Sequence, residues 1–342
     1  MAERTIQETL AQTVRQQLGY TPSKLDGHIK RLLSGDADPK NDLAGLVDRL
    51  LDAATINHTE LFRHPEQFRE FEERLRSLEA RQSTISIWSA ACATGEEAYS
   101  IAQVVRRRNV NASILATDIS DAALAEARNP SPRRAKRLAQ QGISDPEALR
   151  GMIQFTRHSL VSPLPSHLPQ TFDFIFCRNV LIYFSPADAS ALLGRLVRRI
   201  ASAGSLFVAP VESLLGTPEG FVAGETLGVF NRTQAETKVP SGPTGIQSET
   251  ERREIQLLSD VLEDDDQEAS ESRVRQIVSE DPKDPLGWFV LAELLTRRGE
   301  KEQARSCYAK ALSLTDQQTT PLRSMLRAVL EGRMLTESPS AE

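Results

Sequence analysis

The residues WSAACATGEEAYSIA, from Trp88 to Ala102, place two adjacent acids directly after a patch of small side chains. In a doubly wound sheet, the turn after the first strand is where the backbone comes nearest to a bound nucleotide, and small residues leave that approach open. The glycine fingerprint GxGxxG is absent, and Glu96 and Glu97 would repel a phosphate group. The stretch therefore indicates a site at this turn whose ligand presents no phosphate there.

Two interpretations of the acids stay open. Acids in the first turn of a helix are favoured by the helix dipole, so Glu96 and Glu97 need no further role. Alternatively, they face S-adenosylmethionine, which carries an ammonium and a sulfonium group and no phosphate. Its ribose hydroxyls then need an acid at the end of the next strand. Asp118 stands there, 23 residues after Gly95, close to the spacing of about 20 that is used for ribose recognition.

Strand and helix patterns alternate around this turn, over residues 84–236. The apolar runs rich in β-forming residues are ISIWSA, SILATD, IQFTRHS, FDFIFC and SLFVAP. Helical patterns cover Glu96–Arg108 and residues 186–203, and residues 221–233 are expected to supply closing strands. This alternation predicts a parallel sheet with helices on both faces. We therefore expect an α/β, doubly wound, Rossmann-like domain over residues 79–236.

Helical patterns precede this domain, and a linker follows it. Residues 1–78 have apolar positions at helical spacing, with breaks at Gly19, Gly35 and Pro39. They predict an N-terminal all-α domain. Residues 237–251 are rich in Pro, Gly and Ser, which is typical of a flexible linker.

Residues 252–335 predict a C-terminal all-α domain with tetratricopeptide-like repeats, whose period is about 34 residues. One clear repeat places its large, small and aromatic residues at Trp288, Leu291, Ala292, Leu295, Ala304, Tyr308 and Ala311. A degenerate repeat precedes it, from Glu254 to a terminating Pro282, and a capping helix is expected over residues 322–329. A generic helical bundle is the alternative. In either case a concave shared face would suit a protein or peptide partner.

Composition excludes several classes of function. The net charge of the 342-residue chain is −6, which argues against nucleic-acid binding because neutralising phosphates needs a concentrated basic face. The basic clusters around Arg107, Arg134 and Arg198 are expected to be solvated helix faces. No apolar run reaches the roughly 20 residues of a membrane helix, and the N-terminus lacks a signal pattern. We therefore expect a cytoplasmic protein without membrane insertion.

Metal and thiol chemistry are not indicated either. Cys92, Cys177 and Cys307 are far apart and lack CxxC spacing. They predict buried apolar thiols, and neither a zinc site nor a disulfide framework. The five histidines form no HExxH motif or other paired set. We expect no bound metal.

Three stretches together resemble a known family. They are TINHTELFRHPEQF at residues 55–68, IWSAACATGEEAYSIA at 87–102 and FDFIFCRNVLIYF at 172–184. Over about residues 10–233 the chain resembles the CheR-type chemotaxis receptor methyltransferases, and the repeats look like the C-terminal extension that some members carry. The resemblance implies methyl transfer from S-adenosylmethionine to glutamate carboxylates of a methyl-accepting chemotaxis-like receptor. The product would be S-adenosylhomocysteine, and the partner the receptor's cytoplasmic domain.

The resemblance also implies a set of site residues. The cofactor-binding positions are Asn57, Thr59, Arg63, Glu97, Asp118, Ser159, Leu160, Arg178 and Asn179. Glu97 is expected to hold the methionine end and Asp118 the ribose, with Arg63 and Tyr183 as the catalytic pair beside the transferred methyl. No general base is needed, because a carboxylate is already a nucleophile at neutral pH. Without the motifs, Arg63 would be interpreted as a surface ion-pair partner and Tyr183 as a core aromatic.

The chain departs from the family pattern at three places. Ser159 stands where the family has asparagine, and Pro-Val-Glu-Ser at residues 210–213 stands where it commonly has Gly-His-Ser-Glu. Between Asp118 and Phe155 the pattern is helical, without the alternating run of the antiparallel subdomain that docks a receptor's C-terminal peptide in some members. We therefore expect that peptide docking to be missing. The repeats are expected to recruit the receptor or a signalling partner in its place.

Two other functions stay open. The first is another S-adenosylmethionine-dependent enzyme that acts on a small molecule or a nucleic acid. Against nucleic acid stand the acidic charge and the tetrapeptide Cys-Arg-Asn-Val after the fourth strand, where an Asn-Pro-Pro-aromatic motif would be expected. The second is an inactive domain that serves the repeats as a scaffold. Against it stands the joint presence of Arg63, Glu97, Asp118, Asn179 and Tyr183.

Overall fold

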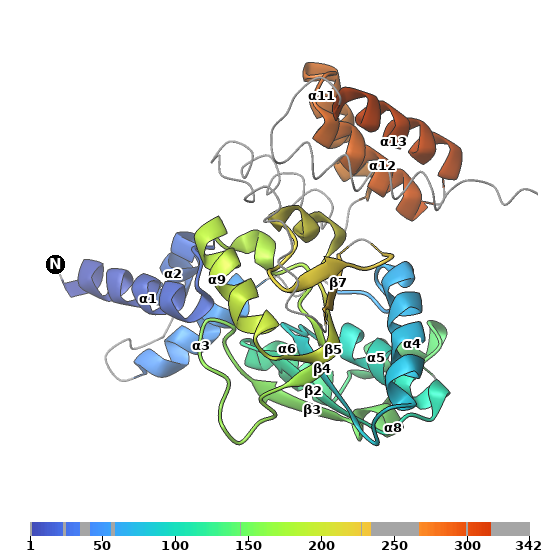
Figure 1. Cartoon of the computed structure of the whole chain (residues 1–342). Coiled ribbons are helices and arrows are strands. Elements are labelled where there is room, and N and C mark those ends of the chain that lie inside the picture. The colour runs from blue at the N-terminus through green and yellow to red at the C-terminus, as the bar shows by residue number, and fades with distance from the viewer. Residues whose placement is uncertain are drawn as a thin grey trace, which may run out of the picture. The chain divides into compact units, whose positions relative to one another are not determined.

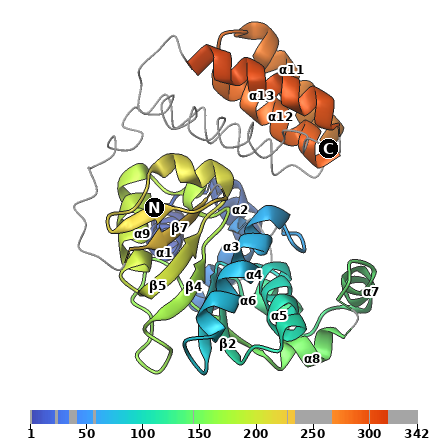
Figure 2. The same cartoon turned by 45° about the vertical axis from the view of Figure 1, so that its right-hand side comes forward.

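The computed structural model describes residues 2–22, 25–34, 42–55, 59–143, 145–226, 228–233, 267–298 and 300–315. The chain divides into two compact units, which Figures 1 and 2 show from two directions. The first unit comprises Met1–Val208 and Gly220–Glu236, and the second comprises Ala209–Glu219 and Thr237–Glu342. Every described strand belongs to the first unit.

Within the described residues, seven strands form one sheet in the order β3-β2-β1-β4-β5-β7-β6. The strands are β1 Ile85–Ala90, β2 Ala112–Asp118, β3 Ile153–Arg157, β4 Phe172–Phe176, β5 Ile200–Phe207, β6 Phe221–Ala223 and β7 Val229–Arg232. Strands β1 to β5 are parallel, which confirms the predicted α/β, Rossmann-like sheet. The closing strands β6 and β7 are antiparallel, so the whole sheet is mixed. The order reverses between β1 and β4, which predicts a ligand crevice at their carboxyl ends.

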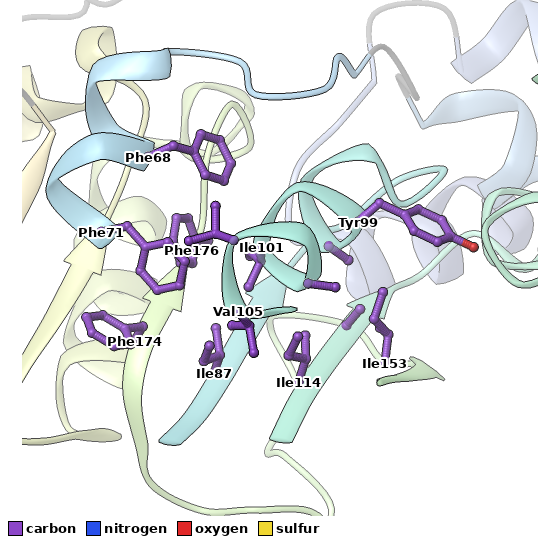
Figure 3. Packing of buried hydrophobic residues seen from close by; sticks show 14 of the residues in the cluster. Phe68, Phe71, Ile87, Tyr99, Ile101, Val105, Ile114, Ile153, Phe174 and Phe176 are labelled. Atoms are coloured by element: carbon purple, nitrogen blue, oxygen red, sulfur yellow. The ribbon is translucent and has the colours of Figure 1, made fainter. Parts of the chain in front are cut away.

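Helices cover both faces of the sheet. Helix α5, Glu96–Arg108, has the predicted bounds and lies with α4, Pro65–Glu79, on one face. Helix α9, Pro186–Val197, lies on the other side of the sheet (Figures 1 and 2). Under α4, the ring of Phe71 meets that of Phe174 edge to face, with 5.0 Å between the ring centroids (Figure 3). Burying one such ring stabilises the fold by about 1.5 to 3 kcal/mol.

The helix predicted over residues 186–203 is too long, and this prediction was wrong at its end. Helix α9 ends at Val197, and Ile200 already pairs with Phe172 of β4 in parallel register. The backbone N–H of Phe172 also donates to the carbonyl of Arg199 at 2.7 Å. Pairing with a fully buried strand therefore overrides the helical pattern of this alanine-rich segment.

The N-terminal residues form three helices with a shared core and a fourth that packs on the sheet. The first three are α1 Ala2–Leu18, α2 Leu25–Leu33 and α3 Leu43–Ala54. Their core includes Leu10, Val14 and Leu46, whereas α4 buries Phe68 and Phe71 in the core of the sheet. Of the predicted helix breaks, Gly19 directly follows α1, and Gly35 and Pro39 lie outside the described residues. The domain boundary at residue 78 stays a prediction.

Polar contacts fix α3 against the carboxyl edge of the sheet. Arg157, at the end of β3, pairs with Asp48 of α3 and with Asp121, the latter at 2.7 Å. The hydroxyl of Ser120 donates to the carboxylate of Asp52, also on α3, at 2.7 Å. The N-terminal helices therefore lie beside the ends of β2 and β3.

Three helices connect β2 to β3, namely α6 Asp121–Arg128, α7 Pro132–Gln140 and α8 Pro146–Arg150. In this interval Ser144 alone lies outside the described residues, and no strand occurs among the others. The helical pattern predicted between Asp118 and Phe155 is confirmed. The absence of receptor-peptide docking stays a prediction.

The described part of the second unit is helical. Its elements are η2 Pro210–Leu215, α11 Gln267–Glu280, α12 Pro285–Arg298 and α13 Lys301–Thr315. The repeat positions on α12 and α13 are buried at Leu291, Ala292, Leu295, Ala304, Tyr308 and Ala311. Trp288 is only half-buried, with its indole N–H donated to the Pro282 carbonyl at 3.0 Å, and Phe289 is buried beside it. The predicted linker, the first helix of the degenerate repeat and the capping helix lie outside the described residues.

The three cysteines all lie within the described residues and are buried with free thiols, as predicted. No described helix has both the length and the hydrophobicity that crossing a bilayer requires. In the same part of the chain, no three His, Cys, Asp or Glu side chains gather closely enough to hold a metal ion.

Candidate active site

A pocket opens at the carboxyl ends of β1, β2 and β4, where the strand order reverses. Among the residues that line it are Thr59, Arg63, Glu97, Asp118, Ser159, Leu160, Arg178, Asn179 and Tyr183. Asn57 lies outside the described residues. The structure thus brings together all the predicted site residues that it describes. The roles assigned to them stay predictions.

Small residues form the turn between β1 and α5. Ala91, Cys92 and Ala93 line the pocket, and both alanines have positive φ, 62° and 47°. This left-handed conformation costs an alanine about 1 to 2 kcal/mol. Gly95 follows as the N-cap of α5 with φ 96°, and its N–H donates to the Cys92 carbonyl at 2.8 Å. Larger side chains here would fill the space in front of the strands, so the small residues keep the pocket open.

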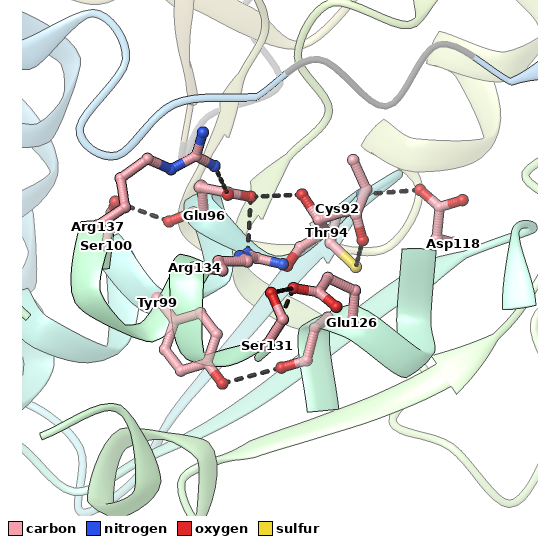
Figure 4. A network of polar contacts seen from close by, with 12 residues as sticks. Cys92, Thr94, Glu96, Tyr99, Ser100, Asp118, Glu126, Ser131, Arg134 and Arg137 are labelled. Atoms are coloured by element: carbon pink, nitrogen blue, oxygen red, sulfur yellow. Dashed lines mark hydrogen bonds and ion pairs between the residues drawn. The ribbon is translucent and has the colours of Figure 1, made fainter. Parts of the chain in front are cut away.

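Glu96 pairs with a basic cluster outside the pocket lining (Figure 4). Its carboxylate contacts Arg134 and Arg137, each at 3.0 Å, and accepts from the Thr94 hydroxyl at 2.8 Å. Arg134 is only 6% exposed, so the expectation that it belongs to a solvated helix face was wrong. The cause is the buried Glu96 carboxylate, which needs a cation nearby. Glu96 therefore stabilises the turn itself.

Glu97 lies in the pocket wall, where both carboxylate oxygens are hydrogen-bonded. Oε1 accepts from the Ser89 hydroxyl and Oε2 from the Nε of Arg178, each at 2.6 Å. The Arg178 guanidinium lies 5.2 Å from the ring centre of Phe68 and donates to the Oε1 of Gln67 at 3.2 Å. The ion pair thus joins the first turn of α5 to the segment after β4 and to α4. The sequence predicted both residues in the site but not their pairing.

Arg178 also fixes the segment that carries Arg63. Its Nη1 donates to the backbone carbonyl of Arg63. Asn179 follows with φ 59°, a left-handed conformation that asparagine tolerates better than most residues. The two residues after β4 therefore set the backbone on two sides of the pocket.

Asp118, at the end of β2, is 7% exposed, and backbone donors hold its carboxylate. Its Oδ2 accepts from the N–H of Ala93 at 2.8 Å and its Oδ1 from the N–H of Ser120 at 2.9 Å. Burial raises the pKa of Asp118 above its ordinary value, and the backbone donors oppose this increase. The carboxylate is thus held rigidly, facing the turn after β1.

Comparison with known proteins decides the family. A family model described as "CheR methyltransferase, SAM binding domain" matches residues 57–226. The chemotaxis protein methyltransferase of Listeria monocytogenes is 31% identical over 189 residues, which cover 50% of this chain and 71% of the relative. The chain belongs to the CheR methyltransferase family. It is therefore an S-adenosylmethionine-dependent methyltransferase.

Other members of the CheR family match a similar share of this chain. The chemotaxis protein methyltransferase of Vibrio anguillarum is 35% identical over 196 residues, 50% of this chain and 70% of the relative. That of Salmonella typhimurium is 30% identical over 206 residues, 54% of this chain and 70% of the relative. Among solved structures, the citrinin polyketide synthase CMeT domain is 18% identical. The match covers 59% of this chain and 48% of the CMeT chain, with a TM-score of 0.30. That score is too low to support an argument.

The pocket of this CheR enzyme fits S-adenosylmethionine by its own chemistry. Two buried carboxylates, those of Glu97 and Asp118, face it. Carboxylates suit an ammonium group and ribose hydroxyls, and they would oppose a phosphate. The thiol of Cys92 adds no charge, because burial, with Asp118 and Glu97 nearby, raises its pKa well above the usual range.

Several residues of the CheR pocket were assigned no site role from the sequence. They include Gln17, Leu18, Tyr20, Thr55, His158 and Phe184. Burial and the charge of Arg199 lower the pKa of His158, so its imidazole is neutral at neutral pH. The one sequence signal near Tyr20 was the helix break at Gly19. No pattern indicated that this break lies against the pocket.

Replacing Gly95 by alanine is expected to lower the free energy of unfolding by about 2 to 4 kcal/mol. The φ of 96° is strained for alanine, and an added Cβ would lie 3.0 Å from the Cβ of Ala127 and 3.3 Å from the ring of Phe155. Gly142 is a matched control, since its φ is 95° and no atom lies within 4 Å. Gly142→Ala should cost only the conformational strain, about 1 to 2 kcal/mol. Urea unfolding of both variants measures the difference, and equal losses would contradict the crowding at Gly95.

Proposed function

We propose that this enzyme methylates glutamate side chains of a methyl-accepting chemotaxis-like receptor, forming glutamyl methyl esters that tune signalling adaptation. The observation that carries the proposal is the convergence of two buried acids with Arg63 and Tyr183 in one pocket. The name chemotaxis protein methyltransferase, which its relatives carry, supports it. The partner is the cytoplasmic domain of the receptor, so the enzyme acts in the cytoplasm.

Under this proposal the pocket residues hold the cofactor by its polar ends. S-adenosylmethionine supplies an electron-poor methyl group on a sulfonium. Asp118 accepts hydrogen bonds from the ribose hydroxyls, and Glu97 faces the ammonium group. Arg178 pairs with the buried Glu97 carboxylate, which offsets part of the cost of burying that charge. The Ser159 hydroxyl is already donated to the Gln17 carbonyl, so we expect it to add little to adenine binding.

The acceptor glutamate brings its own nucleophile. Its carboxyl has an ordinary pKa of about 4.3 and is ionised at neutral pH, so no general base is required. The Arg63 guanidinium would hold one side of the incoming carboxylate, and the Tyr183 hydroxyl would fix its orientation. Well-oriented reacting pairs reach effective molarities of about 10⁵ M or more. Positioning by these residues would therefore supply most of the rate.

Transfer of labelled methyl groups tests the proposal. The purified enzyme is incubated with methyl-labelled cofactor and receptor cytoplasmic fragments, and then with mild base. The proposal expects label on the receptor that base releases, since carboxyl methyl esters are hydrolysed readily. A receptor fragment whose methylated glutamates are changed to glutamine is the control. Label that appears only in nucleic acid or a small molecule would contradict the proposal, as would complete absence of transfer.

For the second unit we propose tetratricopeptide-like repeats that recruit the receptor or a signalling partner. Support comes from α12 and α13, where six repeat positions are buried, including Ala292, Tyr308 and Ala311. A tethered partner raises the local concentration of substrate without adding contacts at the active site.

Deleting residues 237–342 is expected to weaken methylation of intact receptor arrays about 10²-fold or more, because the tether supplies effective concentration. Binding of S-adenosylhomocysteine should be unchanged, since the pocket lies wholly in the first unit. Calorimetry and the labelling assay measure the two effects. Equal losses in both assays would count against recruitment by the repeats.

A further inference from the structure

The turn that ends α1 forms a wall of the cofactor pocket. Gln17 and Leu18, at the end of α1, and Tyr20, just after it, all line the pocket, although they lie outside the three family-like stretches. Tyr20 also packs against the core shared by α1, α2 and α3. This turn therefore links the N-terminal core to the site.

Two contacts hold this turn against the segments that follow β3 and β4. The Ser159 hydroxyl, after β3, donates to the Gln17 carbonyl. Gly19 has φ 79°, and an added Cβ would lie 2.3 Å from the Cγ1 of Val161 and 2.8 Å from the ring of Phe184. Only glycine fits this close approach, so the backbone just before Tyr20 lies directly against Val161 and Phe184.

The next residue, Tyr20, stacks on the aromatic residues that follow β4. Its ring lies 5.5 Å from that of Tyr183, centroid to centroid, at an interplanar angle of 26°. It meets the ring of Phe184 edge to face, also at 5.5 Å. Tyr183 itself belongs to a single 3₁₀ turn, Leu181–Tyr183, and is half-buried. The stacking therefore joins the end of α1 to the turn that carries Tyr183.

We infer that Tyr20 is a positioning residue that holds the Tyr183 ring in the pocket wall. The inference rests on the proposed function, which places Tyr183 beside the transferred methyl. The contact that matters is ring on ring, so phenylalanine at position 20 keeps it and alanine removes it. An aromatic pair contributes about 0.5 to 1.5 kcal/mol beyond its buried area. The expected effect of losing it is about fivefold, equivalent to about 1 kcal/mol at 1.36 kcal/mol per factor of ten.

A double-mutant cycle on Tyr20 and Tyr183 tests the inference, with two measurements on the full chain. The first is the Kd of S-adenosylhomocysteine by calorimetry, which needs no receptor, and the second is kcat for receptor methylation. Tyr20→Ala and Tyr183→Ala should each raise the Kd about fivefold. The Kd of the double variant should be at most about twofold higher than that of either single variant. Tyr20→Ala should also lower kcat about fivefold, and Tyr20→Phe should stay within about twofold of the wild type in both measurements.

Leu33→Ala is the matched control. Leu33 packs against the same N-terminal core as Tyr20 and is not among the residues that line the pocket. It should lower the melting temperature without changing Kd or kcat. Independent, multiplying effects of the two tyrosine variants on Kd would overturn the inference, as would equal effects of Leu33→Ala and Tyr20→Ala. If the receptor is not labelled while the Kd cycle shows coupling, the proposed function fails and the pairing of Tyr20 with Tyr183 stands.

Discussion

Replacing Arg178 by methionine is expected to lower the free energy of unfolding by about 3 to 5 kcal/mol and to remove measurable binding of S-adenosylhomocysteine. The side chains of Arg178 and Glu97 are 3% and 10% exposed, and 2.6 Å separates Nε from the carboxylate oxygen. Methionine has a similar volume, but it leaves the Glu97 carboxylate buried without its cation. Gln67 and the Arg63 carbonyl also each lose the hydrogen bond that Arg178 donates. The pocket would therefore lose its charge balance and the anchor of its Arg63 segment together.

Arg137→Met is the matched control for Arg178→Met. Arg137 also pairs with an acid of the same turn, Glu96, at 3.0 Å, but its side chain is 57% exposed. Exposed pairs contribute about 0 to 1 kcal/mol, so this variant should unfold and bind almost as the wild type does. Urea unfolding and calorimetry measure both variants. If the two lose equal stability, the buried pair of Arg178 and Glu97 does not have the role assigned to it.

Asp118→Asn is expected to weaken binding of S-adenosylhomocysteine about 10- to 150-fold, because hydrogen bonds to a charged acceptor contribute about 1.5 to 3 kcal/mol. Both carboxylate oxygens already accept from backbone N–H groups, those of Ala93 and Ser120. An asparagine amide would turn its NH₂ group toward one of these donors. The ribose would lose its acceptor, and the end of β2 would lose a contact to the turn. Asp121→Asn, an exposed change three residues away, should leave the Kd unchanged.

From the raised pKa of Asp118 we expect cofactor affinity and the stability of the fold to change with pH in opposite directions. Burial raises its pKa in the folded protein above the ordinary 3.8. As pH falls through this raised pKa, the carboxylate is protonated and cofactor affinity falls. The folded state binds this proton more tightly than the unfolded state, so the stability from Asp118 is present below the unfolded pKa and is lost as pH rises through the folded pKa.

Calorimetry of S-adenosylhomocysteine binding from about pH 4 to about pH 8 measures the first effect, and urea unfolding of the apoprotein measures the second. Asp118→Asn should remove both dependences, whereas Asp121→Asn should keep them. An affinity that is flat with pH in the wild type would contradict a direct contact of this carboxylate with the cofactor.

Much of the fold was predictable because local patterns and tertiary packing agree. The five parallel strands were predicted from their β-rich runs, and α5 begins where Gly95 and two acids mark a helix start. The end of α9 was not predictable, because strand pairing at Ile200 competes with a helical sequence. The burial of Arg134 was also missed, since an arginine-rich helix looks solvated until the acid that it pairs with is located.

The candidate site was likewise predictable only in part. Motif residues such as Glu97 and Arg178 were predicted to share a pocket, because a parallel sheet brings the ends of its strands together. The pairing of their charges depends on side-chain directions that no motif encodes. Tyr20 lies at the end of a helix distant in sequence from the other pocket residues. Its position depends on how two cores pack together, and a one-dimensional pattern does not contain that information.

Under the proposed function, one pocket between the N-terminal helices and the first sheet turn binds the cofactor and presents Arg63 and Tyr183 to the acceptor. A crystal structure with S-adenosylhomocysteine tests this most directly. We expect the product to bind with its ribose at Asp118, its amino-acid end near Glu97 and its sulfur facing Arg63 and Tyr183. A structure that shows the product bound elsewhere, or these two side chains turned away from the sulfur, would contradict it.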